Sequence, residues 1–189
     1  MGVTVPDGLQ VFTLAERPDL ESRVDSLPDM FPEFMYHDAT VSRYWGDLFT
    51  VFAGFQIVVC DRGDEVVAAG HCIPVFWDET AEGLPAGLDG VLEQGVRDFE
   101  VGRAPTVVSV LLAIVSHAHR GRGLSIVVLT TMKSVAADHG LGALIAPVRP
   151  SSRSGIRSPR WSATSGGSAQ TGYPSIPGSG STGGSARSS

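Results

Sequence analysis

Residues 107–149 constrain the fold of this chain more than any other stretch. Val107–Val115 is apolar at almost every position and rich in β-branched residues, which is typical of a strand buried on both faces and too short to cross a membrane. After a glycine-bearing turn, Leu124–Gly140 has apolar residues near one helical face, and Gly140 supplies a stop signal. Ala143–Val148 predicts a further strand. The stretch therefore predicts a strand, turn, helix and strand in that order.

The turn at residues 119–125 is the part of this unit where ligand chemistry is expected. The first N–H groups of a helix have no intrahelical partner, and the helix dipole places partial positive charge there. Gly121 and Gly123 would let those N–H groups approach a ligand closely. Arg120 and Arg122 add positive charges that suit phosphate oxygens. The pattern predicts an anion site, most naturally for a pyrophosphate.

Other interpretations of the turn fit the residues less well. A dinucleotide-binding G-x-G-x-x-G would need a glycine at Ile126, and no Lys-Ser/Thr pair follows to make a P-loop. An arginine-rich surface turn without a ligand stays open as the alternative. His117 and His119 have the spacing of a metal-ligand pair, but no third ligand follows at a useful distance. We therefore predict no metal site.

Residues 115–125 resemble the acyl-CoA-binding motif of the GNAT (Gcn5-related) N-acetyltransferases. In that motif a strand-end Val is followed, at the start of a helix, by Arg-Gly-x-Gly-x-Gly/Ala; this chain departs from it at Ser125. The resemblance implies acetyl-CoA or another acyl-CoA as co-substrate, with its pantetheine arm along the strand ending at Val115 and its pyrophosphate on residues 120–125. The implied cofactor-binding residues are Ile114, Val115, Arg120, Gly121, Arg122, Gly123, Leu124 and Ser125.

The rest of the chain predicts an α/β fold. The further elements expected are strands at Leu9–Leu14, Phe55–Cys60 and Glu65–Phe76, and helices from Pro18, over 44–52 and over 91–100. The order is then β, α, α, β, β, α, β, α, β. The resemblance implies a GNAT-like mixed antiparallel/parallel sheet flanked by helices, with the C-terminal part missing and the ligand between the last two, splayed parallel strands.

The chain changes character at Pro150. Residues 151–189 contain 13 Ser and 8 Gly and no acidic residue, a composition that buries too little surface to fold. We therefore predict a GNAT-like acyl-CoA-binding domain over residues 1–150 and a Ser/Gly/Arg-rich disordered tail over 151–189. A further hypothesis is a frameshift: codons read one nucleotide earlier can encode a string that resembles the C-terminal half of actinobacterial GNAT-like proteins.

The net charge and the two cysteines indicate in which cellular compartment the protein works and which classes of partner it binds. A net charge of −6 gives no electrostatic reason to expect nucleic-acid binding. Cys60 and Cys72 lack the spacing of a metal or redox motif and suit a reducing cytoplasm as small buried apolar residues. No signal peptide or membrane anchor is recognised. The sequence thus predicts a cytoplasmic protein without a membrane partner; a homodimer stays open.

The catalytic residues are less well defined than the cofactor site. Acyl transfer to an amine needs a positioned thioester, a polarised carbonyl and a deprotonated amine. The resemblance implies polarisation by a backbone N–H around Ile114 or Val115. Many family members carry a Glu on this strand, but residues 111–113 are Leu, Leu and Ala. The candidates for a general base elsewhere are Glu33, His37, Asp38 and His71.

Two functions from different classes follow. The first is an acyl-CoA-dependent N-acyltransferase that acetylates an amine of an unidentified small molecule or peptide. The second is a catalytically inactive, truncated acyl-CoA-binding or interaction domain, favoured by the missing Glu and by the lack of a matching Tyr after the last strand. Aromatic residues that would border the acceptor cleft by resemblance, or else pack in the core, are Phe31, Phe34, Tyr36, Tyr44 and Trp45.

Overall fold

The computed structural model describes residues 5–27, 38–148 and 160–164, and its centre is a six-stranded sheet in the order β1-β2-β3-β4-β5-β6. The strands are β1 (Leu9–Thr13), β2 (Gln56–Asp61), β3 (Val66–Val75), β4 (Val107–Val115), β5 (Ala143–Val148) and β6 (Arg160–Thr164). β4 and β5 pair in parallel, and the other neighbours pair antiparallel. The predicted mixed α/β sheet is confirmed.

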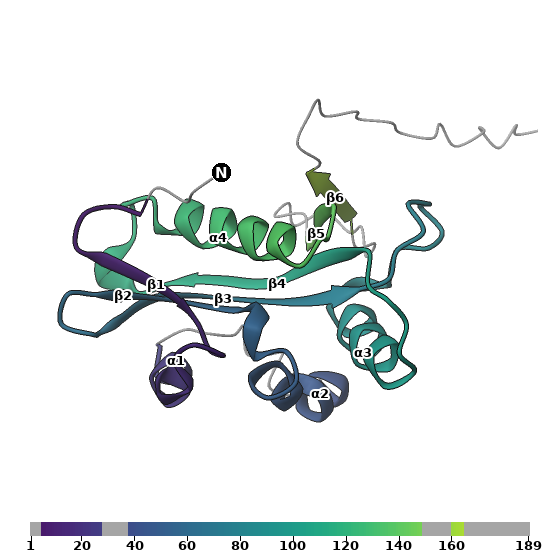
Figure 1. Cartoon of the computed structure of the whole chain (residues 1–189), viewed down its shortest axis with the longest axis horizontal. Helices are drawn as coiled ribbons and strands as arrows, with labels where there is room; N and C mark the ends of the chain where they lie inside the picture. The colour runs from purple at the N-terminus through teal and green to yellow at the C-terminus, as the bar shows by residue number, and fades with distance from the viewer. Residues whose placement is uncertain (1–4, 28–37, 149–159, 165–189) are drawn as a thin grey trace, which may run out of the picture.

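Helices cover both faces of this sheet. They are η1 (Pro18–Leu20), α1 (Glu21–Asp25), α2 (Ala39–Phe49), η3 (Ala53–Phe55), α3 (Gly87–Glu100), η4 (His117–His119) and α4 (Leu124–Asp138). α4 lies on one face, and α1, α2 and α3 lie on the other (Figure 1). Val128 and Met132 of α4 are fully buried against the sheet, as are Leu48 of α2 and Leu92 of α3 on the opposite face. Burial of each such side chain stabilises the fold by roughly 1.5–3 kcal/mol.

The second helix starts and ends earlier than the predicted range of 44–52. Asp38 precedes its first residue, and one carboxylate oxygen of Asp38 accepts the backbone N–H groups of Thr40 (2.8 Å) and Val41 (3.0 Å). These bonds satisfy N–H groups that the first turn of a helix leaves without partners. Asp38, a candidate general base by sequence, is therefore the N-cap of α2 in the structure.

Two β-bulges shape the middle of the sheet. Val67 is the extra residue of β3, because Val59 pairs with Ala68 while Cys60 pairs with Val66. Leu111 is the extra residue of β4, because His71 pairs with Leu112 while Cys72 pairs with Val110. A bulge bends its strand and increases the local twist. The bulge in β4 comes shortly after the pairing with β5 has ended at Ser109.

Gly70, in the middle of β3, allows the sheet and α4 to approach closely. A Cβ at this position would overlap the side chains of Val128 and Met132. A glycine in the middle of a strand often marks a bulge or a close backbone approach, and at Gly70 the structure shows the approach. It fixes α4 directly over the centre of the sheet, so that the start of α4 lies beside the end of β4.

The last strand falls in the segment for which the sequence predicted no packed structure. β6 pairs antiparallel with β5, from Leu144 opposite Thr164 to Val148 opposite Arg160. Such pairing does not require alternating apolar residues in the added strand, because it is made by hydrogen bonds between the backbone N–H and C=O groups of the two strands. The rest of the tail lies outside the described residues, and its disorder and the frameshift hypothesis stay predictions.

Candidate functional site: an opening in the sheet and an Arg-Gly turn

β4 and β5 are paired over only three residues each. The parallel ladder joins Val107 to Ala143 and ends where Ser109 meets Ile145. β4 continues to Val115 with β3 on its other side. From residue 110 onward, one edge of β4 therefore carries backbone groups that no strand satisfies within the described part of the chain.

The pairing with β3 decides which backbone groups face this opening. Ser116 donates its N–H to the carbonyl of Val67 (2.9 Å), and groups alternate in direction along an antiparallel ladder. The N–H of Ile114 is therefore directed at β3. The N–H groups of Ala113 and Val115 are directed at the opening. Ala113 is exposed although it lies in the middle of the sheet.

The Arg-Gly turn, residues 120–125, follows β4 and η4. Gly121 and Gly123 both have φ +77°, a left-handed conformation that favours glycine. Gly123 is the N-cap of α4, and no side chain caps this helix. Leu124 is buried and belongs to the same apolar cluster as Val115. The buried leucine thus fixes the first turn of α4 beside the end of β4.

The turn presents backbone donors that the protein does not use. Ile126 and Val127 donate their N–H groups to the carbonyl of Gly123 (3.0 and 3.3 Å). Among the described residues, the N–H groups of residues 121–125 have no hydrogen-bond partner. The positive end of the helix dipole adds to them. The arrangement fits an anion held by several N–H groups.

The arginine and histidine side chains beside the turn are ordered by short contacts. Arg120 Nη1 lies 3.0 Å from His117 Nε2, and a guanidinium can only donate, so this ring nitrogen accepts. Ser116 Oγ lies 2.8 Å from His119 Nδ1. None of the ion pairs in the described residues involves Arg120 or Arg122. Both guanidinium groups are exposed and can meet a phosphate.

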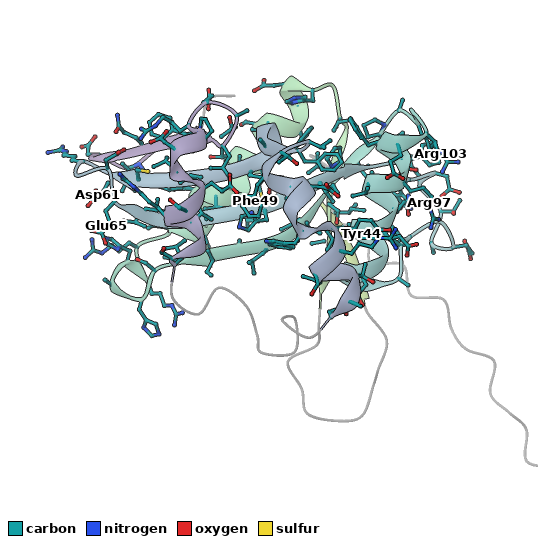
Figure 2. All side chains as sticks on the ribbon, turned by 90° about the horizontal axis from the view of Figure 1, so that it is seen from below. Tyr44, Phe49, Asp61, Glu65, Arg97 and Arg103 are labelled. Carbon is teal, nitrogen blue, oxygen red and sulfur yellow. The ribbon has the colours of Figure 1, made fainter. Side chains whose placement is uncertain are left out.

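Two candidate general bases, Asp38 and His71, lie in the described residues, and of these only His71 is in the interior. Its side chain is fully buried, and burial lowers its pKa to about 4, so the ring is neutral at pH 7. Nδ1 lies 3.1 Å from Oε1 of Gln56. The rings of Trp45 and Phe49, from α2, contact it edge-on with centroids 5.3 and 5.5 Å away; Figure 2 shows Phe49 over the middle of the sheet.

The other candidates are placed differently. Backbone hydrogen bonds to the first turn of α2 lower the pKa of Asp38. Tyr44 and Trp45 are half-buried on α2, and the guanidinium of Arg43 lies 5.0 Å from the Tyr44 ring centroid. The remaining candidates, Glu33, His37, Phe31, Phe34 and Tyr36, lie outside the described residues.

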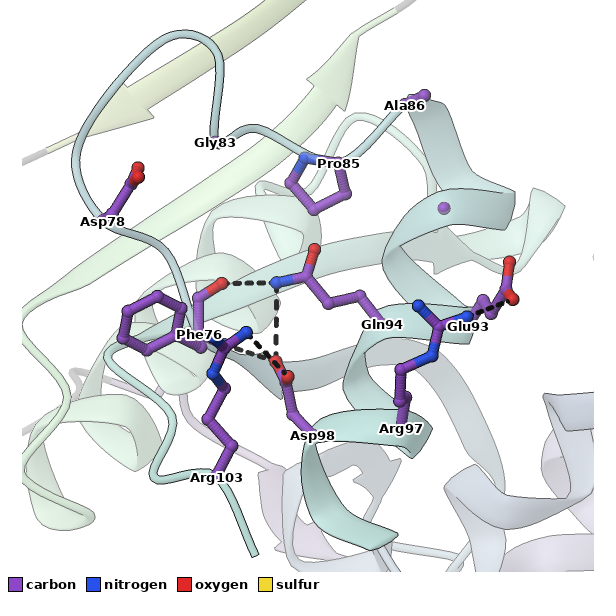
Figure 3. A pocket seen from close by; sticks show the side chains of 11 residues that line it. Phe76, Asp78, Gly83, Pro85, Ala86, Glu93, Gln94, Arg97, Asp98 and Arg103 are labelled. Carbon is purple, nitrogen blue, oxygen red and sulfur yellow. Dashed lines mark hydrogen bonds and ion pairs between the residues drawn. The ribbon is translucent and has the colours of Figure 1, made fainter. Parts of the chain in front are cut away.

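A separate pocket of about 410 Å³ lies between α3 and the loop after β3. There the buried Asp98 accepts the N–H of Phe76 (2.9 Å) and lies 3.6 Å from Nη1 of Arg103, whose guanidinium stacks 4.3 Å from the Phe76 ring centroid (Figure 3). Its charged groups therefore satisfy one another. The pocket is at the N-terminal end of β4, and the Arg-Gly turn follows the other end of this strand, which is about 30 Å long; the two sites are therefore separate.

Neither a metal site nor a membrane span is found in what the structure describes. No three His, Cys, Asp or Glu side chains gather there in a way that would hold a metal ion. No helix in residues 5–27 or 38–148 combines the length and apolar character needed to cross a bilayer.

Sequence reasoning missed Gln56. Its side chain is fully buried at the start of β2, where Nε2 donates to the carbonyls of Phe52 (2.8 Å) and Cys72 (2.9 Å). Its register partner on β3 is His71. The available signal was one polar residue at the start of an apolar strand, and such a residue must find partners when it is buried.

The chain is similar to known acetyltransferases in sequence and in fold. No family model matches the chain. An arginine N-acetyltransferase, avaD, from Aspergillus versicolor is 30% identical over 168 residues, which cover 82% of this chain and 57% of that protein. This chain thus spans less than two thirds of the length of its curated relative.

Solved structures share the fold. A GNAT family acetyltransferase from Brucella melitensis, in complex with acetyl-CoA, is similar with a TM-score of 0.50 and 11% identity over 84% of this chain and 88% of that one. The GNAT-like decarboxylase GphF, in complex with isobutyryl-CoA, has a TM-score of 0.50 and 14% identity over 75% and 65%. This chain therefore has the GNAT fold and is a homologue of an N-acetyltransferase.

Proposed function

We propose that this protein is an acyl-CoA-dependent N-acyltransferase that transfers an acetyl group to the amine of a small molecule or peptide. The opening between β4 and β5, which leads to the unpartnered N–H groups of residues 121–125, carries this proposal. The pantetheine amides would pair with the free edge of β4 up to Val115. The pyrophosphate would lie on the Arg-Gly turn, between the start of α4 and the guanidinium groups of Arg120 and Arg122.

The edge of β4 also supplies a donor for the thioester carbonyl. Of the two N–H groups that the resemblance implies, that of Val115 faces the opening and that of Ile114 faces β3. We assign polarisation of the carbonyl to donors that face the opening, Val115 or Ala113. A fixed backbone donor stabilises the negative charge that develops on the oxygen during acyl transfer.

The acceptor is proposed by class. The homologous fungal protein is named for arginine N-acetylation, so an amino-acid amine is the first choice. The alternative function, a catalytically inactive acyl-CoA-binding domain, is favoured by the absence of a carboxylate over residues 111–113 of β4.

A melting curve and a turnover assay test the proposal together. Acetyl-CoA at 100 times its Kd should stabilise the chain by about 2.7 kcal/mol, a shift on the order of 5–10 °C for a domain of this size. Acetyl-pantetheine, which lacks the pyrophosphate, should give a much smaller shift. Acetylation of L-arginine and of a panel of other amines would identify the acceptor. A shift without turnover of any amine would support the inactive binding domain, and the absence of a shift would refute the acyl-CoA site.

A further inference from the structure

The pair formed by Gln56 and His71, called here the Gln56–His71 pair, carries an inference about the proton transfer in the proposed reaction. The two residues face each other across β2 and β3 and are completely buried. One ring nitrogen, Nε2 of His71, is buried without a hydrogen-bond partner in the part of the chain that the structure describes. A buried polar atom left in that state is costly unless a ligand or water meets it.

The amide of Gln56 fixes which ring nitrogen carries the proton. Nε2 of Gln56 donates to two backbone carbonyls, those of Phe52 and Cys72. A flipped amide would place its oxygen against both carbonyl oxygens, so Oε1 must be the atom that faces His71. Oxygen Oε1 can only accept, and Nδ1 of His71 therefore carries a hydrogen. A neutral ring with a hydrogen on Nδ1 has its lone pair on Nε2.

The surroundings keep the ring in this form. The side chains of Trp45 and Phe49 contact it from α2, Gln56 from β2, and Leu112 lies opposite on β4. None of them carries a charge, and burial alone lowers the pKa of the ring to about 4. At neutral pH, Nε2 is therefore an acceptor.

His71 also lies at the stretch of β4 that the acyl group would use. Its register partner Leu112 follows the bulge at Leu111, within the length of β4 that has left β5. Opposite residues of a ladder point to the same face of a sheet, so the ring is on the side of α1–α3. The start of α4, with the Arg-Gly turn, is on the other side. An amine that uses His71 would therefore approach the thioester from the α2 side of the sheet, where Trp45 and Phe49 contact the ring.

We propose that His71 is the general base that takes the proton of the acceptor amine, and that Gln56 is the positioning residue that holds His71 in the tautomer with a free Nε2. This inference rests on the proposed function. In the step, the amine nitrogen forms a bond to the thioester carbonyl carbon and its proton passes to Nε2. The carbon–sulfur bond then breaks, and the proton passes from Nε2 to the leaving thiolate, which leaves the ring neutral.

A weakly basic ring is sufficient for this role. Attack on the carbonyl gives an adduct whose nitrogen bears a positive charge and is far more acidic than a free ammonium group. The base therefore needs to be neutral and correctly placed more than strongly basic. The negative charge on the carbonyl oxygen of the same adduct also favours a positive imidazolium nearby.

Kinetics of His71 variants test the base. His71→Gln should lower kcat/KM for the amine by roughly a hundredfold to ten-thousandfold, while the melting shift with acetyl-CoA stays at the wild-type value. Phe49→Leu, which changes the packing against the same ring, is the matched control and should lose less than tenfold. In His71→Ala, added imidazole should restore part of the activity, which a purely structural role would not allow. Unchanged turnover in a folded His71→Gln would overturn the proposal.

Nitrogen NMR of the ring tests the tautomer independently of activity. Wild type should show a protonated Nδ1 and an unprotonated Nε2 at pH 7. In Gln56→Leu that form should no longer dominate, and kcat should fall with little change in KM for acetyl-CoA. A protonated Nε2 in wild type would overturn the assignment, whether or not Gln56→Leu folds.

The same measurement separates the two proposals if wild type acetylates no amine. The proposed function would then have failed, and the response of the ring to propylamine in the presence of CoA decides the role of His71. A shift of the Nε2 signal would support contact with the amine. An unchanged signal would refute it.

Discussion

The Arg-Gly turn and the Gln56–His71 pair are polar sites on the same sheet with opposite construction. Apart from the buried Leu124, the turn is exposed, and the N–H groups of residues 121–125 have no hydrogen-bond partner among the described residues. The pair is fully buried, and three of its four polar groups are satisfied within the protein. Changes in the turn should therefore affect ligand binding with little effect on folding. Changes in the pair should affect folding and chemistry together.

The largest effect is expected from Gln56→Leu. This change removes a partner from the carbonyls of Phe52 and Cys72 and from Nδ1 of His71. Each buried polar group left without a partner costs about 1–3 kcal/mol, so the free energy of unfolding should fall by roughly 4 kcal/mol. Urea denaturation measures this. Gln10→Leu, the same change at an exposed position of β1, should alter the free energy of unfolding by no more than about 0.5 kcal/mol. Equal losses in both variants would mean that the hydrogen bonds of the buried Gln56 do not stabilise the fold.

The second effect is a dependence of the free energy of unfolding on pH, which the buried ring of His71 causes. The pKa of His71 is about 4 in the folded chain and 6.5 ordinarily, so the unfolded chain binds more protons between these values. Stability is then complete above about pH 6.5 and is lost as the pH falls toward 4, by about 3 kcal/mol. Denaturation midpoints between pH 4 and 7.5 measure it.

His71→Phe is the control for this pH dependence, and its stability should be nearly flat over the same window. Asp38, Asp64 and Asp78, whose pKa values are lowered by hydrogen bonds, add losses only at lower pH. Parallel curves for wild type and His71→Phe would show that the ring titrates normally and is not buried in solution.

The third effect tests the exposed site. Arg120→Glu reverses a charge beside the proposed pyrophosphate and should weaken acetyl-CoA binding by about 2 kcal/mol, roughly thirtyfold. The melting temperature of the free protein should not change. Titration calorimetry measures the affinity.

Arg97→Glu is the matched control for Arg120→Glu. Arg97 is exposed on α3 at the end of the sheet opposite Asp61 and Glu65 (Figure 2), and its reversal alters the net charge equally. Equal losses of affinity in the two variants would mean that binding depends on the net charge of the protein and does not depend on a contact at the turn.

The same contrast explains what could be predicted from the sequence. The turn is local: the apolar strand, the Arg-Gly residues and the helix are consecutive, so spacing alone predicted an anion site at residues 120–125. The predicted strands of the sheet were likewise read from apolar runs and turn residues. Asp38 was one of four candidate general bases; because the helix was predicted to start at residue 44, its place as the N-cap of α2 was not foreseen.

The Gln56–His71 pair was beyond local reasoning because it depends on register. Without the bulge at Val67, the pairing of Cys60 with Val66 would place Gln56 opposite Gly70; with the bulge its partner is His71. A shift of one residue reverses the face of every side chain in a strand. The residues around Val67 give no signal for a bulge. The sequence therefore predicted that His71 lies in a strand, but it could not predict that His71 lies opposite Gln56.

The smallest effect separates the shape of the turn from its charge. Gly123 has φ +77°, and no atom lies within 4 Å of the place that a Cβ would take, so Gly123→Ala is opposed by backbone conformation alone, at about 1 kcal/mol. Gly46→Ala is the counterpart, since Gly46 lies in α2 with equal space around it, and alanine there should stabilise the chain by about 0.7 kcal/mol. Thermal denaturation of the two variants should therefore give shifts of opposite sign. Shifts of the same sign would mean that residue 123 is not left-handed in solution and that the N–H groups of the turn do not converge as described.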